Sequence, residues 1–157
     1  FGIDPQQALA AVASYEPDNN RSQVKQSERG TGNVLYMDAY NANPSSMHAA
    51  LDNFLGIDTN GAPKVVILGA MRELGEYTAT EHAAVVERLL PSRDTVRILL
   101  VGEEFAEAGR KNGLDVFETT DMLIANLTDL TQAVLTGSHI LIKGSRGMAL
   151  EKVYELL

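Results

Sequence analysis

Cysteine is absent from the 157-residue sequence, and histidine occurs only three times. The absence of cysteine excludes disulfides and thiolate zinc sites and fits a reducing compartment. No apolar stretch is long enough to cross a bilayer, and the first residues lack the basic region and apolar core of a signal peptide. The net charge of −8 argues against a general surface for nucleic acid or anionic membranes. We therefore expect no nucleic-acid partner and no membrane insertion, although a local cationic pocket for a phosphate remains compatible.

Apolar residues make up 45% of the chain, which is ordinary for a globular protein and sufficient for one well-buried domain. Beyond the first 32 residues, apolar runs alternate with helical patterns. The predicted strands are 33–38, 64–68, 96–101, 115–118 and 139–143. The predicted helices are 45–55, 78–90, 103–112, 121–135 and 146–156. Three of the strands are continuous apolar runs, which suit strands buried on both faces. The predicted fold class is therefore α/β, a three-layer Rossmann-like domain with a mostly parallel sheet.

The first 31 residues are predicted to form a separate part of the chain. Asp4 is placed to cap a short helix over 4–15. Residues 17–32 are polar and contain turn residues and one candidate strand around 22–26, so we interpret them as a linker or a hairpin at the domain edge. The main domain is expected over 32–157. Because the sequence begins with Phe rather than Met, we expect a fragment of a longer protein.

The polar run from Asp38 to Ser46 directly follows the first predicted strand. It contains a carboxylate, the amides of Asn41 and Asn43, a proline and two hydroxyls. Ligands bind at the carboxyl ends of strands in open α/β sheets, so this run is a candidate site. The same residues also favour a turn, and a serine here could cap the next helix. The residues alone leave both interpretations open.

A second candidate at the same edge of the sheet is the run from Lys143 to Gly147, immediately before the helix predicted at 146–156. Small residues allow backbone N–H groups to face an anion, and a helix start adds partial positive charge. Lys143 and Arg146 would add full charges, which predicts an anion-binding edge. Glycine turns between strand and helix are common, however, and the glycine spacing is not that of a Walker P-loop.

Three further residues are individual candidates. Glu73 lies in the loop after the second large strand, and His82 lies in a helical stretch, where a histidine is commonly buried or solvated. Arg21 lies in the polar linker, where it is either solvated or placed at a seam between two domains to reach a nucleotide. No metal-ligand spacing and no Ser-His-Asp arrangement is visible.

Three separated segments resemble the carboxy-terminal domain of the Mur ligases: Asp38–Met47, Leu68–Glu76 with His82, and Ile142–Arg146. The sequences of these segments are most similar to those of the members that add D-alanyl-D-alanine to UDP-MurNAc-tripeptide. The opening helix and the segment Asn20-Arg21-Ser22 resemble the end of the family's central ATPase domain. Their order and spacing make a chance match improbable.

The resemblance implies a cytoplasmic, ATP-dependent amide ligase of peptidoglycan precursor synthesis. In that family the first domain binds the UDP-sugar peptide, the central domain carries the P-loop and the Mg²⁺ ligands, and the third domain closes the site. This chain would be the third domain with a tail of the second. Its implied partners are then the amino-terminal and central domains of the same chain, UDP-MurNAc-tripeptide and D-alanyl-D-alanine. The fragment alone is expected to be inactive.

The resemblance also implies roles for individual residues. The nucleotide side would comprise Arg21, Asp38, Asn41 and Asn43. The side of the incoming substrate and of domain closure would comprise Lys143, Ser145, Arg146, Glu73 and His82. Replacing Asp38 with Ala is expected to impair ATP use with little loss of stability, because a carboxylate at the edge of a sheet contributes little to a core.

Two alternatives remain from the sequence. One is a sister enzyme, namely another Mur ligase or a folylpolyglutamate-type ligase. The other is a non-catalytic nucleotide-binding module of the same fold. The segments Tyr40–Pro44 and Lys143–Arg146 favour the D-alanyl-D-alanine ligases. A P-loop upstream in the parent protein would favour a ligase over a binding module.

Overall fold

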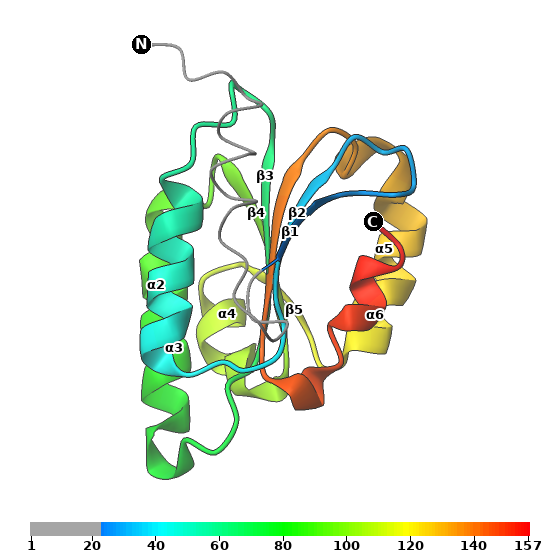
Figure 1. The fold of residues 1–157 in the computed structure, drawn as a ribbon. Coiled ribbons are helices and arrows are strands. Elements are labelled where there is room, and N and C mark those ends of the chain that lie inside the picture. The colour runs from blue at the N-terminus through cyan, green and yellow to red at the C-terminus, as the bar shows by residue number, and fades with distance from the viewer. Residues whose placement is uncertain (1–22) are drawn as a thin grey trace.

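The computed structural model describes residues 23–157, without the side chains of residues 128–134, and its centre is a six-stranded sheet in the order β1-β2-β6-β3-β4-β5 (Figure 1). The strands are β1 (Gln23–Gln26), β2 (Val34–Asp38), β3 (Lys64–Gly69), β4 (Val96–Val101), β5 (Asp115–Phe117) and β6 (His139–Lys143). Every pairing is parallel except that of β1 with β2. The predicted α/β class with a mostly parallel sheet is confirmed.

Helices cover both faces of the sheet. They are α2 (Pro44–Leu55), α3 (Thr78–Leu89), α4 (Ala106–Lys111), α5 (Thr120–Val134) and α6 (Glu151–Tyr154). α2, α3 and α4 lie on one side of the sheet, and α5 and α6 lie on the other (Figure 1). The result is the three-layer arrangement expected from strands that alternate with helices.

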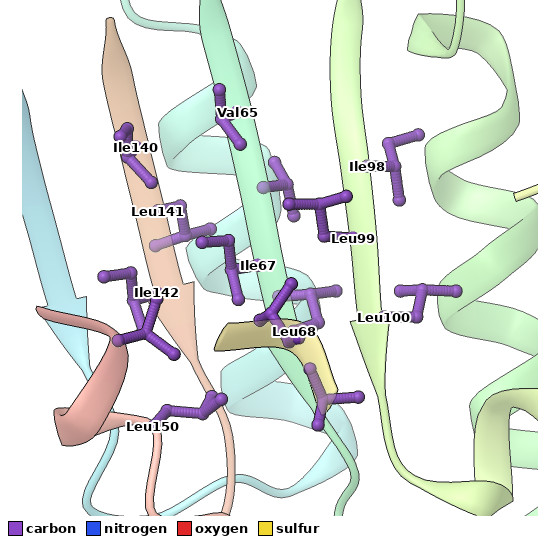
Figure 2. Packing of buried hydrophobic residues seen from close by; sticks show 14 of the residues in the cluster. Val65, Ile67, Leu68, Ile98, Leu99, Leu100, Ile140, Leu141, Ile142 and Leu150 are labelled. Atoms are coloured by element: carbon purple, nitrogen blue, oxygen red, sulfur yellow. The ribbon is translucent and has the colours of Figure 1, made fainter. Parts of the chain in front are cut away.

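The core is centred on β3, β4 and β6, the three strands with continuous apolar runs. Figure 2 shows their side chains pointing to both faces of the sheet, among them Ile67, Leu68, Leu100 and Ile142, all of which are fully buried. Burying one such side chain stabilises the fold by about 1.5–3 kcal/mol. Strands buried on both faces fix the position of their carboxyl ends, where the candidate site lies.

The predicted helix over 146–156 is wrong in detail. A 3₁₀ turn covers Arg146–Met148, Ala149 adopts a left-handed conformation with φ of 52°, and α6 spans only Glu151–Tyr154. The helix cannot pass through Ala149 in that conformation. Met148 and Leu150 are buried against Gly69, so their packing overrides the helical pattern.

The predicted helix over 103–112 also begins later than expected. A 3₁₀ turn covers Glu103–Phe105 and α4 follows it. Phe105 is fully buried, and its aromatic ring stands edge-on to the His82 ring at a centroid distance of 4.6 Å. The tight turn therefore brings an aromatic side chain into the core directly after β4.

The candidate strand around 22–26 is present as β1, and it forms an antiparallel hairpin with β2. Residues of this hairpin also form hydrogen bonds with Leu157. Leu157 O accepts hydrogen bonds from Ser27 Oγ, Thr31 Oγ1 and Asn33 Nδ2 at 2.5, 2.8 and 3.3 Å. Residues 23–38 thus form a hairpin at the edge of the sheet. The helix predicted at 4–15 lies outside the described residues, and the boundary at residue 31 stays a prediction.

Candidate functional site

The carboxyl ends of β2, β3, β4 and β6 meet at one edge of the sheet, as parallel pairing requires. At this edge Asp38, the last residue of β2, lies opposite Lys143, the last residue of β6. Lys143 Nζ donates to Asp38 Oδ2 at 2.5 Å and to the main-chain oxygen of Asn41 at 3.2 Å. The side chain of Lys143 is 1% exposed and that of Asp38 is 23% exposed. A buried ammonium therefore holds a half-buried carboxylate at the strand end.

A hollow of about 290 Å³ opens above this ion pair. It is lined by Asp38, Tyr40, Asn41, Asn43, Ser46 and Lys143. The lining combines the carboxylate of Asp38, the exposed amide side chain of Asn41 and the half-exposed ring of Tyr40. Such a surface suits a small polar ligand with hydrogen-bond donors and a flat group. The hollow lies at the place where open α/β sheets bind ligands.

Asn43 caps α2, which confirms that turn chemistry operates in the first loop. Its Oδ1 accepts from Ser46 N and from Ser45 Oγ, both at 2.9 Å. In return, the main-chain N–H of Asn43 donates to Ser46 Oγ at 3.2 Å, which completes a capping box. Asn43 therefore lines the hollow while its side-chain oxygen is engaged in starting the helix.

The structure separates Lys143 from Arg146. Lys143 is buried and its charge is balanced by Asp38, whereas Arg146 is exposed and lies over the Tyr40 ring at 5.6 Å from the centroid. The segment after β6 begins with a 3₁₀ turn in place of the predicted helix start. The predicted anion-binding edge therefore loses both the helix N-terminus and one of its two free cations.

The loops after β3, β4 and β6 are bound to one another, and we call them the three-loop plate (residues 69–73, 102–105 and 144–148). The main-chain N–H of Ala70 donates to Val101 O at 2.8 Å, and that of Ser145 donates to Ala70 O at 3.3 Å. Ser145 Oγ accepts from the main-chain N–H of Arg72 at 3.0 Å. Ser145 is 8% exposed, so it links two loops from inside the plate.

His82, on α3, holds the same plate through a buried hydrogen bond to its first segment, residues 69–73. Its Nε2 accepts the main-chain N–H of Met71 at 3.0 Å, and its Nδ1 donates to Thr78 O at 2.6 Å. These two bonds define the neutral tautomer with the proton on Nδ1. Burial lowers the pKa of His82, and the bond to Thr78 O opposes that shift. His82 is therefore buried beneath the edge of the sheet, with both ring nitrogens engaged.

Glu73 and Arg21 complete the predicted set. Glu73 is exposed on the plate, with a left-handed backbone φ of 64°. Arg21 lies outside the described residues. Sequence reasoning did not single out Tyr40 or Arg72, although both lie beside predicted residues. Arg72 forms an ion pair with Glu104 at 2.5 Å. Tyr40 lies two residues after Asp38 in the sequence, and this position could have indicated that its ring lines the hollow.

Metal ligation does not fit the part of the chain that the structure describes. Among those residues, no three histidine, aspartate or glutamate side chains lie close enough together to hold an ion. Across the same residues, no helix is both long enough and apolar enough to cross a membrane.

The domain belongs to the α/β class with a mostly parallel sheet, and its polar hollow lies at the edge where such domains bind ligands. Residues 20–146 match the family described as "Mur ligase, glutamate ligase domain", and the chain belongs to this family. It is similar to the UDP-N-acetylmuramoyl-tripeptide--D-alanyl-D-alanine ligase of Treponema pallidum, with 35% identity over 128 residues, covering 79% of this chain and 27% of that protein. It is also similar to the Bacillus subtilis protein of the same name, with 31% identity over 158 residues, covering 98% of this chain and 34% of that protein.

Solved structures of similar fold agree with these relatives. One is MurF from Acinetobacter baumannii, with a TM-score of 0.71 and 26% identity, covering 97% of this chain and 32% of that one. Another is the MurF ligase from Thermotoga maritima in complex with ADP, with a TM-score of 0.68 and 23% identity, covering 99% of this chain and 33% of that one. At this identity the likeness shows the fold alone. The chain thus spans between 27% and 34% of the length of these relatives.

Proposed function

We propose that this chain serves as the carboxy-terminal domain of an ATP-dependent ligase that adds D-alanyl-D-alanine to UDP-MurNAc-tripeptide. The observation that carries the proposal is the Asp38 carboxylate, which a buried lysine holds at the hollow beyond β2. The names of the relatives supply the reaction, and their greater length accommodates the further domains it needs. Those amino-terminal and central domains are the proposed partners, in the cytoplasm.

The proposed reaction joins a carboxylate to an amine in two steps. The γ-phosphoryl group of ATP passes to the tripeptide carboxylate, giving ADP and an acyl phosphate. The amine of D-alanyl-D-alanine then attacks the acyl carbon, the amide bond forms and phosphate leaves. Such chemistry depends on positioning, charge neutralisation and the exclusion of water from the acyl phosphate. A domain that closes over the site meets the last need.

We assign the candidate residues of this chain to two proposed roles according to where they lie. Asp38 and Asn41 border the hollow, where the carboxylate is proposed to accept and the amide to donate hydrogen bonds to the nucleotide. Arg21, which lies outside the described residues, is proposed to serve the same side by its resemblance alone. Asn43 positions α2 at the same place. Mg²⁺ would neutralise phosphate charge in such a reaction, and the resemblance places its ligands in the central domain; among the described residues here no three His, Asp or Glu side chains lie close enough together to hold an ion.

The incoming-substrate side is proposed on the plate. Arg146 and Glu73 are exposed there and are available to a dipeptide, whose two ends carry opposite charges. Ser145 and His82 hold the loops that carry them, so their contribution to substrate use is indirect. Lys143 is buried in its ion pair and does not share this exposure.

A chimaera tests the proposal directly. The carboxy-terminal third of the Bacillus subtilis relative is replaced by this chain, and phosphate release and the UDP-MurNAc-peptide product are measured with ATP, Mg²⁺, UDP-MurNAc-tripeptide and D-alanyl-D-alanine. We expect turnover that requires the dipeptide, while this chain alone gives none. A folded chimaera without dipeptide-dependent turnover would contradict the proposal. Nucleotide binding by the chain in that case would indicate a non-catalytic module.

A further inference from the structure

We infer that Lys143 is a positioning residue of the nucleotide side: it acts through Asp38 and the first loop (residues 39–43) and does not bind the dipeptide. The inference rests on the proposed function and deepens it. It moves Lys143 from the substrate group, where the resemblance placed it, to the other side of the site. The observations are its burial, its two oxygen partners and the hollow above them.

Lys143 reaches the first loop from a fixed base. It is the last residue of β6, which lies between β2 and β3 at the centre of the sheet (Figure 1). Its Nζ contacts the carboxylate of Asp38 and the main-chain oxygen of Asn41, which lie three residues apart. Two attachment points on one ammonium group determine both where the loop leaves β2 and where it turns. The direction of the Asp38 carboxylate follows from the same contacts.

The charge balance argues against a direct role for Lys143 in binding an anion. Its side chain is 1% exposed, and its only ion pair among the described residues is with Asp38. An incoming carboxylate or phosphate at this point would meet the Asp38 carboxylate as well, and like charges repel. A group that donates hydrogen bonds, such as the hydroxyls of a ribose, would instead meet an oriented acceptor.

Ala42 is buried in the core, but among the described residues no second polar side chain ties the first loop to another strand. The capping bonds of Asn43, Ser45 and Ser46 are local to the start of α2 and do not cross to another strand. Tyr40 contacts Arg146, but both side chains are exposed. Lys143 is therefore the buried polar link between the first loop and the rest of the carboxyl edge. Its removal should disturb the nucleotide contacts before any others.

Steady-state kinetics of the chimaera test this inference with Lys143→Met. We expect the KM for ATP to rise by about tenfold or more, while the KM for D-alanyl-D-alanine stays within about twofold. Lys152→Met is the matched control, because Lys152 forms an exposed pair with Asp121 at 3.1 Å and should change neither constant. A rise confined to the dipeptide KM, or no change in either KM, would overturn the inference. The unmodified chimaera tests the proposed function separately.

A double substitution keeps the test decisive if Lys143→Met alone fails to fold. Asp38→Asn and Asp38→Asn/Lys143→Met are compared, since the second protein contains no buried charge without a partner. If Lys143 acts through Asp38 and the first loop, its loss in the Asp38→Asn background should raise the KM for ATP by clearly less than its loss in the wild type, because only the contact with Asn41 O remains to be lost. A rise as large as in the wild-type background would show that Asp38 is not part of its action and would overturn the inference. A change in the dipeptide KM would return Lys143 to the substrate side.

Discussion

The two parts of the carboxyl edge are built in different ways. In the three-loop plate, three successive main-chain N–H groups, those of Ala70, Met71 and Arg72, each donate to a different element of the fold. The first loop is tied to the sheet through the side chain of Lys143. One part is fixed by backbone bonds and small residues, and the other by a charged contact. The comparison indicates that the first loop depends on a charged contact and the plate on main-chain bonds and close packing.

The largest effect is expected from filling a close approach between main-chain atoms in the plate. A Cβ atom on Gly144 would lie 2.9 Å from Gly69 Cα and 2.8 Å from a methyl of Leu150. Gly144→Ala should therefore lower the free energy of unfolding by about 3 kcal/mol, because main-chain atoms cannot move aside as a side chain can. Urea unfolding measures it. Gly147→Ala, where a Cβ meets nothing within 4 Å, is the control. Equal effects would contradict the packing account.

The next effect concerns Asp38 and reverses the expectation drawn from its place at the edge of the sheet. Asp38→Ala leaves the ammonium of Lys143 buried without an anion, and we expect a loss of about 2 kcal/mol in the free energy of unfolding, less than for a fully buried pair because Asp38 is partly exposed. Lys143→Met should cost less, because Asp38 is partly exposed and can be hydrated. Denaturant titrations of both variants decide it. An Asp38→Ala protein as stable as the wild type would show that the pair carries no structural role.

His82 provides a pH test of the plate alone. Because burial lowers its pKa in the folded state, the unfolded chain binds a proton more readily, and stability should fall as the pH drops below about 6.5. The pKa of His139 is also lowered, so the wild type must be compared with His82→Gln. Unfolding free energies at pH 7.5 and 5.5 should differ more in the wild type. Identical differences would exclude His82 as the source.

The smallest effect is expected from the surface of the plate. Arg72 pairs with Glu104 across two loops, but the Arg72 side chain is 53% exposed. Arg72→Ala should change the free energy of unfolding by about 0.5 kcal/mol, since solvent screens such pairs. The same urea titration checks it. A loss as large as that of Gly144→Ala would mean that charge also holds the plate together.

Much of the fold was predictable because its strands are long apolar runs. Val65–Leu68, Ile98–Val101 and Ile140–Ile142 can be buried on both faces only in a covered parallel sheet, which places the loops that follow them at one edge. The helix after β6 was not predictable in detail. Its interruption at Ala149 follows from the packing of Met148 and Leu150 against a glycine that is distant in the sequence.

The candidate site was predictable in location but not in the pairing of its charges. Position at strand ends identified Asp38 and Lys143, whereas their contact depends on β2 and β6 being neighbours, which the order along the chain does not show. His82 and Ser145 were found as motif residues, but their role beneath and between loops depends on tertiary contacts. Polar residues in a motif can therefore support a site from inside without facing its ligand.

Native-state hydrogen exchange, measured in the wild type and in Lys143→Met, tests the central comparison most directly. The amides of residues 70–72 should be strongly protected in both proteins. The amides of residues 40–42, for which the described part of the chain offers no main-chain acceptor, should be weakly protected in the wild type and exchange faster still in Lys143→Met. Equal protection of the two segments, or a first loop unchanged by the substitution, would contradict the account.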